Sequence, residues 1–488
     1  MNSVSIEILI VLTIFTIYFL IVTFLRGKLE KRKITAIGPI LLIRTEKGLK
    51  FLEFFARHKN FWRIFGSIGI LLVLFGMAYM LSLILIMDYI MLTSPPKPSP
   101  ATSPRNVLLI PGLNEYIPLT WGIIGLIVTL IVHEFSHAIL ARVEGVRVKS
   151  LGIVLALIPI GGFAEPDEKE LLEKDRKARM RIYSAGIVAN MIVALLAFAT
   201  FFYLLGFLQP HVVVVKSFEN FEEGEVILKV NGLDVETAED ILRAVDKNVN
   251  VVVRGKDGSI RELNLKPLMG VYIVGILNGT PAMKAGIKEN SVILAINGTK
   301  TPNVEVFRSI MLKTKPNQTV RLEIMENGVI KVYNITLSKI DDHGFIGVLI
   351  GGDYFCGAVI GYSKNIIDSL TNIPPNLEGL LRLTAMPFYF RSFDGITNYF
   401  TPKGFFANYN NLIFYLLNTF YWIAWLNFYV GLFNCLPAIP LDGGRLLNDL
   451  LKYFVSENIA NKLTRYLALF VFASIIFSIL IPNVTFSI

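Results

Sequence analysis

Six long apolar stretches constrain the fold of this chain more than any other feature. The hydrocarbon core of a bilayer is roughly 30 Å thick, and about 20 apolar helical residues cross it. The stretches run over residues 4–25, 64–87, 119–143, 182–208, 412–433 and 463–480. Hydrophobic residues make up 53% of the 488, more than a soluble chain of this length normally carries. We expect a multi-span α-helical membrane protein of about six transmembrane helices with an inserted β-rich soluble region.

The basic residues between the stretches predict the orientation in the membrane. Eleven Lys or Arg lie within residues 26–63 and nine within 142–181, whereas residues 88–118 hold two. Cytoplasmic loops carry the excess of Lys and Arg. We therefore expect a multi-pass protein of the cell membrane, with both termini and the region 209–410 on the extracytoplasmic side. Because the basic residues cluster beside apolar stretches, the net charge of +9 indicates orientation, and we expect no nucleic-acid partner.

The region 209–352 changes to short apolar alternations broken by turns, which is typical of β structure. It contains an internal repeat, because residues 224–232 recur as residues 290–298 and both copies end in Asn-Gly. An Asn-Gly pair favours a tight turn after a strand. A helix-like segment follows each copy, at 237–245 and 303–311.

The second copy of the repeat follows the run Gly-Thr-Pro-Ala-Met-Lys-Ala-Gly-Ile at residues 279–287. This run resembles the signature of bacterial-type PDZ domains, and the first copy lacks it. PDZ domains bind extended peptide ends by adding a strand to a sheet edge. The resemblance thus implies a PDZ-like tandem insert that binds peptide ends; the alternative is a spacer that packs on itself.

One motif carries chemistry, and it lies inside the third apolar stretch. The sequence there is His133-Glu134-Phe135-Ser136-His137. Histidines four residues apart on a helix share one face, so both imidazoles can reach one metal ion, and the glutamate can act as a general base. The alternative is a pair of core histidines. Ionisable groups at membrane depth are costly and usually functional, which favours the metal site.

A third ligand is needed, and Asp442 is the strongest acidic candidate. It directly follows the fifth apolar stretch, where Pro437 and Pro440 interrupt a helix and Gly443 and Gly444 permit a sharp turn. Irregular backbone at membrane depth occurs where it is buried in protein or lines a wet cavity. Asp442 can instead be the N-cap of a short helix. The three other histidines lie outside the apolar stretches: His58, His211 and His343.

The pairing of this HExxH motif with a distant Asn-x-x-Pro and Leu-Asp-Gly-Gly element at 434–444 resembles the site-2 protease family of intramembrane metalloproteases. The resemblance implies regulated intramembrane proteolysis, with peptide bonds cut within or near the transmembrane segments of single-span membrane proteins. It implies one zinc ion per chain, held by His133, His137 and Asp442, with Glu134 as the catalytic carboxylate.

The family also carries a Gly-x-x-x-Asn element, here Gly186 to Asn190, although Ile187 stands where members often have proline. By this resemblance Gly186, Asn190 and Asn434 are expected to bind or position the substrate; the alternative for the two asparagines is hydrogen bonding between helices. The family further places a membrane-embedded sheet or a re-entrant hairpin near residues 152–165, whose exposed edge would pair with an unwound substrate.

The expected organisation has five parts. They are anchor spans with a basic cytoplasmic loop (1–92), the first half of the catalytic core (119–208), the PDZ-like insert (209–352), an aromatic interfacial linker (353–410), and the second half of the core with the last span (411–488). Two other function classes remain open: a membrane-anchored PDZ scaffold with a structural metal site, and a metal transporter.

Overall fold

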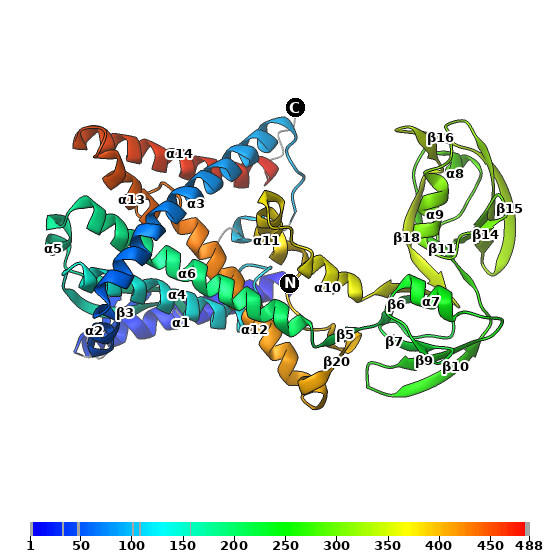
Figure 1. The fold of residues 1–488 in the computed structure, drawn as a ribbon, viewed down its shortest axis with the longest axis horizontal. Helices are drawn as coiled ribbons and strands as arrows, with labels where there is room; N and C mark the ends of the chain where they lie inside the picture. Colours follow the sequence, from blue (N-terminus) through cyan, green and yellow to red (C-terminus); the bar gives the residue numbers. More distant parts are fainter. Residues whose placement is uncertain are drawn as a thin grey trace. The chain divides into compact units, whose positions relative to one another are not determined.

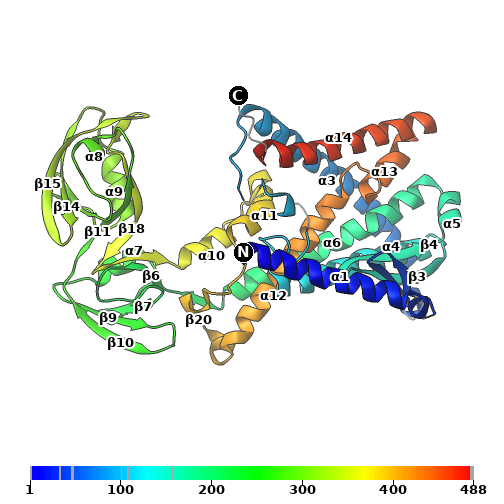
Figure 2. The same ribbon diagram turned by 180° about the vertical axis from the view of Figure 1, so that it is seen from behind.

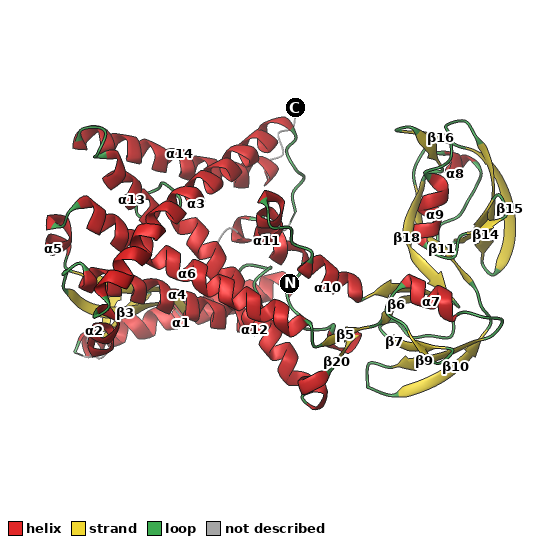
Figure 3. Cartoon of the chain, in the orientation of Figure 1, coloured by secondary structure: helices red, strands yellow, loops and turns green. Residues whose placement is uncertain are grey.

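The chain forms two compact units (Figure 1). Unit 1 comprises Met1–Tyr203, Leu380–Ser392 and Tyr415–Ile488, and unit 2 comprises Leu204–Gly379 and Phe393–Phe414. The structure is a computed structural model, and it describes residues 3–31, 34–45, 49–99, 102–106, 109–156 and 158–483. Figure 3 shows that helices make up most of unit 1 and strands most of unit 2. Each unit is therefore assembled from separated pieces of the sequence.

Long helices dominate unit 1, and Figure 2 shows them from the opposite side. Their bounds are α1 Ser3–Glu30, α2 Leu49–Ala56, α3 Lys59–Thr93, α4 Leu119–Val143, α5 Glu168–Glu173, α6 Arg176–Leu205, α11 Leu377–Tyr389, α12 Asn410–Asn434, α13 Asp442–Leu451 and α14 Glu457–Asn483. Among the described residues, five helices are long and apolar enough to cross a membrane: α3, α4, α6, α12 and α14. This is consistent with the predicted membrane-protein class.

The helices match five of the six predicted stretches, with different ends. Helix α14 has 27 residues, which is longer than the 18-residue stretch predicted at 463–480. Helix α6 ends at Leu205 rather than at residue 208, because Leu208–Pro210 forms strand β5. The remaining stretch, 4–25, lies in α1, and most of its side chains up to residue 15 are outside the described part of the chain. The sixth span therefore stays a prediction.

Glycines allow the central helices of unit 1 to approach one another closely. A Cβ atom on Gly125 of α4 would lie 2.7 Å from the Trp422 carbonyl oxygen of α12. A Cβ atom on Gly69 of α3 would lie 2.8 Å from the Ser184 hydroxyl of α6. Small residues at such crossings are the usual way in which membrane helices pack. They bring α4, which carries the HExxH motif, directly against α12.

A four-stranded antiparallel sheet lies beside α4. Its strands are β1 Ile34–Ile37, β2 Ile40–Thr45, β3 Val148–Ala156 and β4 Ile158–Pro166, in the order β1-β2-β3-β4. The hairpin expected at 152–165 is present as β3 and β4, and α4 packs on both strands. The sequence did not predict β1 and β2, which lie in the basic loop after α1. The last strand, β4, forms one edge of the sheet.

Unit 2 is built on one large sheet and two separate two-stranded sheets, with short helices beside the large sheet. Its main strand order is β10-β9-β7-β6-β19-β18-β11-β12-β14-β15. The strands are β5 Leu208–Pro210, β6 Val212–Ser217, β7 Val226–Val230, β8 Leu233–Asp234, β9 Val249–Arg254, β10 Ile260–Leu265, β11 Met269–Ile276, β12 Val292–Ile296, β13 Thr299–Lys300, β14 Thr319–Glu326, β15 Val329–Thr336, β16 Ser338–Ile340, β17 His343–Phe345, β18 Val348–Phe355, β19 Ala358–Tyr362 and β20 Phe400–Pro402. The helices are α7 Ala238–Ala244, α8 Pro281–Lys284, α9 Val304–Met311 and α10 Lys364–Thr371.

The internal repeat is confirmed at both copies. Strand β7 turns into β8 at Asn231-Gly232, and β12 turns into β13 at Asn297-Gly298. All four residues have positive φ, between 48° and 80°, as a type I′ turn requires. Helices α7 and α9 follow at the predicted places.

The two repeat lobes are nested rather than consecutive. We define the first lobe as residues 212–265 with 353–362, and the second lobe as residues 269–352. Phe355, Ala358 and Ile360 are buried in the core of the first lobe together with Val212 and Ile227. This arises because β19 pairs with β6, so β structure continues to Tyr362, beyond the limit predicted at residue 352. The second lobe has its own core and is inserted into the first.

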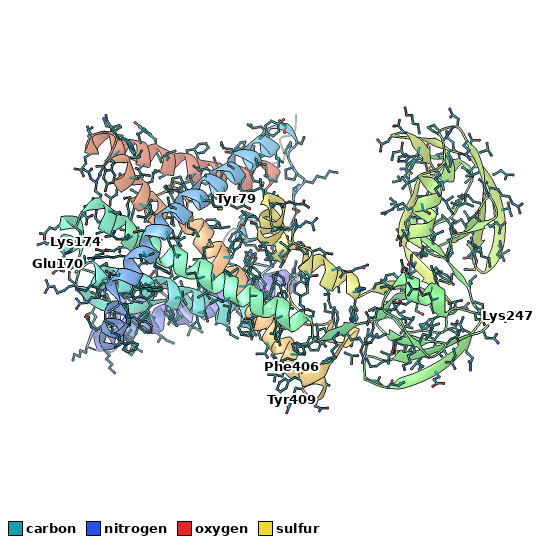
Figure 4. The ribbon with its side chains drawn as sticks, in the orientation of Figure 1. Tyr79, Glu170, Lys174, Lys247, Phe406 and Tyr409 are labelled. Atoms are coloured by element: carbon teal, nitrogen blue, oxygen red, sulfur yellow. The ribbon has the colours of Figure 1, made fainter. Side chains whose placement is uncertain are left out.

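Aromatic side chains gather where the chain leaves unit 2 for α12. Phe207 and Phe406 meet edge to face at 5.3 Å, and Phe405 stacks on Tyr409 at 5.6 Å. Figure 4 labels Phe406 and Tyr409 at this turn. Aromatic rings of this kind favour the membrane interface. Part of the expected aromatic linker thus forms a short aromatic turn, and other parts form the end of β18, β19, α10, α11 and β20.

The buried His211 is expected to make the stability of unit 2 depend on pH. Burial and the nearby Arg254 guanidinium lower the pKa of His211 to about 4. Its Nε2 atom lies 2.7 Å from the Thr401 hydroxyl. Between about pH 6.5 and pH 4 the unfolded chain binds a proton that the folded chain does not, so the free energy of unfolding falls as the pH drops, by up to about 3 kcal/mol.

The measurement is the urea concentration at which half of unit 2 is unfolded, at pH 7 and at pH 4.5. Protease cleavage of the full chain in nanodiscs reports the unfolding. His211→Gln should reduce the difference between the two midpoints. A difference equal in the parent and the variant would show that His211 does not control acid stability.

Candidate metal centre

Three side-chain donors meet in unit 1. His133 Nε2 and His137 Nε2, one turn apart on α4, lie 3.1 Å from each other. Asp442 Oδ2 lies 3.1 Å from the first and 3.0 Å from the second. All three side chains are at most 13% exposed. The structure thus brings together the two histidines and the aspartate that the sequence singled out, across 305 residues from His137 to Asp442.

The local sequence explains how Asp442 reaches the histidines. It is the first residue of α13, and the cap position before it belongs to Leu441, which has no side-chain cap. The N-cap alternative for Asp442 is therefore wrong, since its carboxylate faces the histidines. Cβ atoms on Gly443 and Gly444 would lie 2.3 Å and 2.5 Å from the backbone of Cys435 and Ala438. Only glycine lets α13 start this close to the preceding segment.

Each imidazole is held at its other nitrogen. His137 Nδ1 donates to the Ile182 carbonyl at 2.7 Å, which keeps the proton on Nδ1 and leaves the Nε2 lone pair for a metal. His133 Nδ1 lies 3.2 Å from the Asn190 side-chain amide, and Asn190 Oδ1 is buried without a partner among the described residues. Rotating that amide by 180° places the oxygen on His133 Nδ1–H and satisfies it. Both histidines then present Nε2 to the same point.

The donor set passes a simple test for zinc. Two imidazole nitrogens and one carboxylate oxygen are common zinc ligands. Donors about 2.0–2.1 Å from one tetrahedral ion lie roughly 3.3 Å from one another. The observed separations of 3.0–3.1 Å are close to that value. The buried Asn190 oxygen supports the same conclusion, because it is satisfied only in the arrangement that frees His133 Nε2.

Glu134 does not belong to this set of donors. Its Oε2 atom accepts a 2.7 Å hydrogen bond from the backbone N–H of Ala164. Ala164 lies on β4, the edge strand of the sheet that packs on α4. The sheet therefore fixes the carboxylate beside the histidines and leaves it free to accept a proton.

The remaining predicted residues divide into two groups. Gly186 of α6 packs on the imidazoles, since a Cβ atom there would lie 2.5 Å from His137 Nε2 and 2.7 Å from His133 Nδ1. Helix α6 runs unbroken through Ile187, which is buried. Asn434 donates to the Val430 carbonyl of its own helix at 3.1 Å, so its side chain does not join the cluster in this conformation.

Comparison with known proteins places the chain in a family. The model of peptidase family M50 matches residues 121–478, which span the histidines and Asp442. The chain belongs to peptidase family M50.

Similar proteins of known sequence extend this M50 assignment. An uncharacterized protein of Methanocaldococcus jannaschii, MJ0971, is 26% identical over 84% of this chain and 77% of its own length. Protease RseP of Yersinia pestis is 23% identical over 67% of this chain and 90% of its own length. A membrane-bound transcription factor site-2 protease homolog of Arabidopsis thaliana is 29% identical over 24% of this chain and 25% of its own length. The predicted resemblance to site-2 proteases and the predicted function, an intramembrane metalloprotease, are confirmed.

Sequence patterns missed several groups that support this M50 site. The Ile182 carbonyl and the Ala164 N–H are backbone groups, which leave no signature in the residue type. Arg179 of α6 binds Asp449 of α13 through two hydrogen bonds of 2.7 Å and 2.6 Å. The pair fixes α13, and therefore Asp442, against α6. A pattern search would need to match one arginine and one aspartate 270 residues apart.

Proposed function

We propose that this chain cuts membrane proteins within the bilayer with one zinc ion per chain, held by His133, His137 and Asp442. The proposal rests on one observation: three buried donors from two distant segments lie 3.0–3.1 Å apart. Three protein ligands leave a position open, as in catalytic zinc sites, whereas structural sites usually have four. This favours catalysis over the scaffold alternative.

Glu134 is the proposed general base. When bound, zinc supplies a Lewis acid that polarises a peptide carbonyl and lowers the pKa of water. Glu134 accepts the proton of the attacking water and passes it to the leaving amine. The Ala164 N–H orients this carboxylate, and Asn190 orients His133. Gly186 keeps the space beside both imidazoles free of a side chain.

The proposed substrates are single-span membrane proteins. A helix shields its amide bonds with its own hydrogen bonds, so a substrate must unwind before cleavage. Among the described residues, strand β4 has a neighbouring strand on one side only, and its other edge can pair with an unwound backbone. Asn434, at the end of α12, is a candidate for holding that backbone once its side chain turns from Val430. We assign the catalytic core to residues 119–208 and 411–488, after anchor spans within 1–92.

We further propose that the chain lies in the cell membrane with unit 2 on the extracytoplasmic side, from the distribution of basic loop residues. In this arrangement the PDZ-like region 209–352 captures the ends of peptides near the membrane. The aromatic part of 353–410 lies at the interface. Capture outside and cleavage inside are then tasks of different units.

Metal analysis tests the proposal. Purified protein in nanodiscs should contain about one zinc per chain and should cut a single-span substrate. Removing the ion with a chelator should abolish cleavage, and added zinc should restore it, because the ligands belong to the folded helices. Cleavage that persists after the zinc is gone would rule out a zinc-dependent reaction. Folding that depends on zinc, without any cleavage, would instead support a PDZ scaffold with a structural metal site.

A further inference from the structure

Two adjoining cavities form a groove along α9 in unit 2. One part is a cavity of about 420 Å³ between α9 and the segment 343–352, lined by Phe307, Met311 and Ile350 among others. The other part is a cavity of about 1100 Å³ beside α7 and β19. Val304, Arg308 and Gly352 line both, so the cavities adjoin near the start of α9. We call them the apolar half and the acidic half.

The strand beside the groove has an open edge. Strand β18 pairs with β11 along its whole length, but with β19 only over Asp353–Phe355. Among the described residues no strand pairs with the second edge of β18 over residues 348–352. An open edge beside an apolar groove binds an extended peptide by strand addition, with alternate side chains entering the groove.

The start of β18 can receive a terminal carboxylate. The carbonyls of Ile346 and Gly347 accept hydrogen bonds of 2.9 Å from the backbone N–H groups of Ala282 and Leu277. A trans peptide points its N–H opposite to its C=O, so the N–H groups of Gly347 and Val348 turn away from these partners. Both residues line the apolar half. Successive free N–H groups of this kind bind carboxylates.

The acidic half carries a strong negative charge. Its lining has six carboxylates and two cationic side chains: Asp234, Glu236, Glu239, Asp240, Glu305, Asp353, Arg308 and Lys364. The Asp353 carboxylate already has partners within the protein, since it accepts hydrogen bonds from the Val304 N–H and the Tyr362 hydroxyl. Glu236 and Glu305 form no ion pair within the described part of the chain. A ligand that enters this half therefore needs positive charge.

We propose that the groove binds extended peptide ends with an apolar C-terminal residue and with lysine or arginine upstream. The carboxylate lies at Gly347 and Val348, and the peptide runs antiparallel to β18 toward Gly352. At about 3.3 Å per residue, the acidic half is reached about five to eight residues before the end. This inference rests on the proposed capture of peptide ends by unit 2, and it adds the direction and the charge of the ligand.

Fluorescence anisotropy tests the proposal with the full chain in zwitterionic nanodiscs. The probes are 12-residue peptides ending in valine, with lysines or with glutamates at the upstream positions, and an amidated form of the lysine peptide. We expect the lysine peptide to bind at least ten-fold tighter than the glutamate peptide at low salt, and the preference to shrink in 1 M salt. Amidation should weaken binding, because it removes the carboxylate.

Variants separate the two halves of the groove. Glu236→Gln and Glu305→Gln should each lower affinity for the lysine peptide about two- to five-fold. An uncharged peptide of the same length should bind both variants as it binds the parent, which shows that they are folded. Glu262→Gln, at an exposed carboxylate on β10 outside the groove, is the matched control.

The outcomes are distinguishable. Equal binding of the lysine and glutamate peptides overturns the charge preference while leaving peptide capture intact. Equal binding of the free and amidated ends overturns recognition of the terminus. If no peptide binds, both the inference and the proposed capture by unit 2 are wrong, whereas the zinc-dependent cleavage stands on its separate test.

Discussion

Replacing Glu134 with glutamine is expected to lower kcat/KM for a single-span substrate by about 10²- to 10⁴-fold, the usual contribution of a general base. Glutamine keeps the size of the side chain, and its carbonyl can still accept the hydrogen bond that Ala164 N–H donates to Glu134 at 2.7 Å. It cannot take a proton from water. The zinc content should remain about one ion per chain, because Glu134 is not one of the three donors.

Activity and zinc content must be measured on the same preparation. The matched control is Glu168→Gln, at an exposed carboxylate on α5, which should cleave at the parental rate. Parental activity in a zinc-loaded Glu134→Gln protein would remove Glu134 from the mechanism. Loss of both zinc and activity would instead assign Glu134 a role in building the metal site.

The second large effect is expected at Gly186. The Cβ atom of Gly186→Ala would lie 2.5 Å from His137 Nε2 and 2.7 Å from His133 Nδ1, and the backbone of α6 cannot easily withdraw. The imidazoles must rotate away from their common point. We expect zinc affinity to fall by about 10- to 100-fold, as when the support of metal ligands is disturbed. Competition with a chromophoric chelator measures this affinity.

Gly431→Ala is the matched control for Gly186→Ala. It is the same substitution in another apolar helix near the site. Its Cβ atom would lie 2.8 Å from the flexible tip of Met191, and at ordinary contact distances of 3.5 Å from Asn190 Cβ and 3.6 Å from the Ile187 carbonyl oxygen. Zinc affinity should stay within about two-fold of the parental value, since such a side chain can move aside. Excess zinc should partly restore cleavage in Gly186→Ala. Unchanged zinc affinity in Gly186→Ala would mean that α6 does not limit the positions of the two histidines.

The sequence was most informative where one local pattern determines structure. Apolar length predicts a spanning helix, and five of the six stretches correspond to helices long enough to cross a membrane. Histidines four residues apart must share a helix face, so their spacing alone pairs His133 with His137. The assignment of Asp442 as a ligand needed more than a local pattern, because its N-cap alternative was equally compatible with the local sequence. Only the fold shows its carboxylate turned toward the histidines.

Long-range pairing was beyond the reach of these patterns. Strand β19 looks like a linker by itself, and it becomes part of the first lobe because its partner, β6, lies more than 140 residues earlier. Strands β1 and β2 were not predicted, because the basic residues of their loop were interpreted only as a signal of orientation in the membrane. Asn190 was expected either to hold the substrate or to form a hydrogen bond between helices, and its amide lies on His133, since helix α6 places it beside α4.

The nesting of the lobes has a consequence for modularity. Met269 is the first residue of the second lobe, and its partner in the β11–β18 ladder is Phe355, three residues after the lobe ends at Gly352. Antiparallel partners lie about 5 Å apart, a gap that a short hairpin turn can close. The second lobe therefore enters and leaves the first lobe at neighbouring points. It carries the apolar half of the groove, so that half can be exchanged with the lobe while the acidic wall at α7 and β19 stays with the first lobe. Ligand preference can then diverge among relatives while the metal-bearing helices stay unchanged.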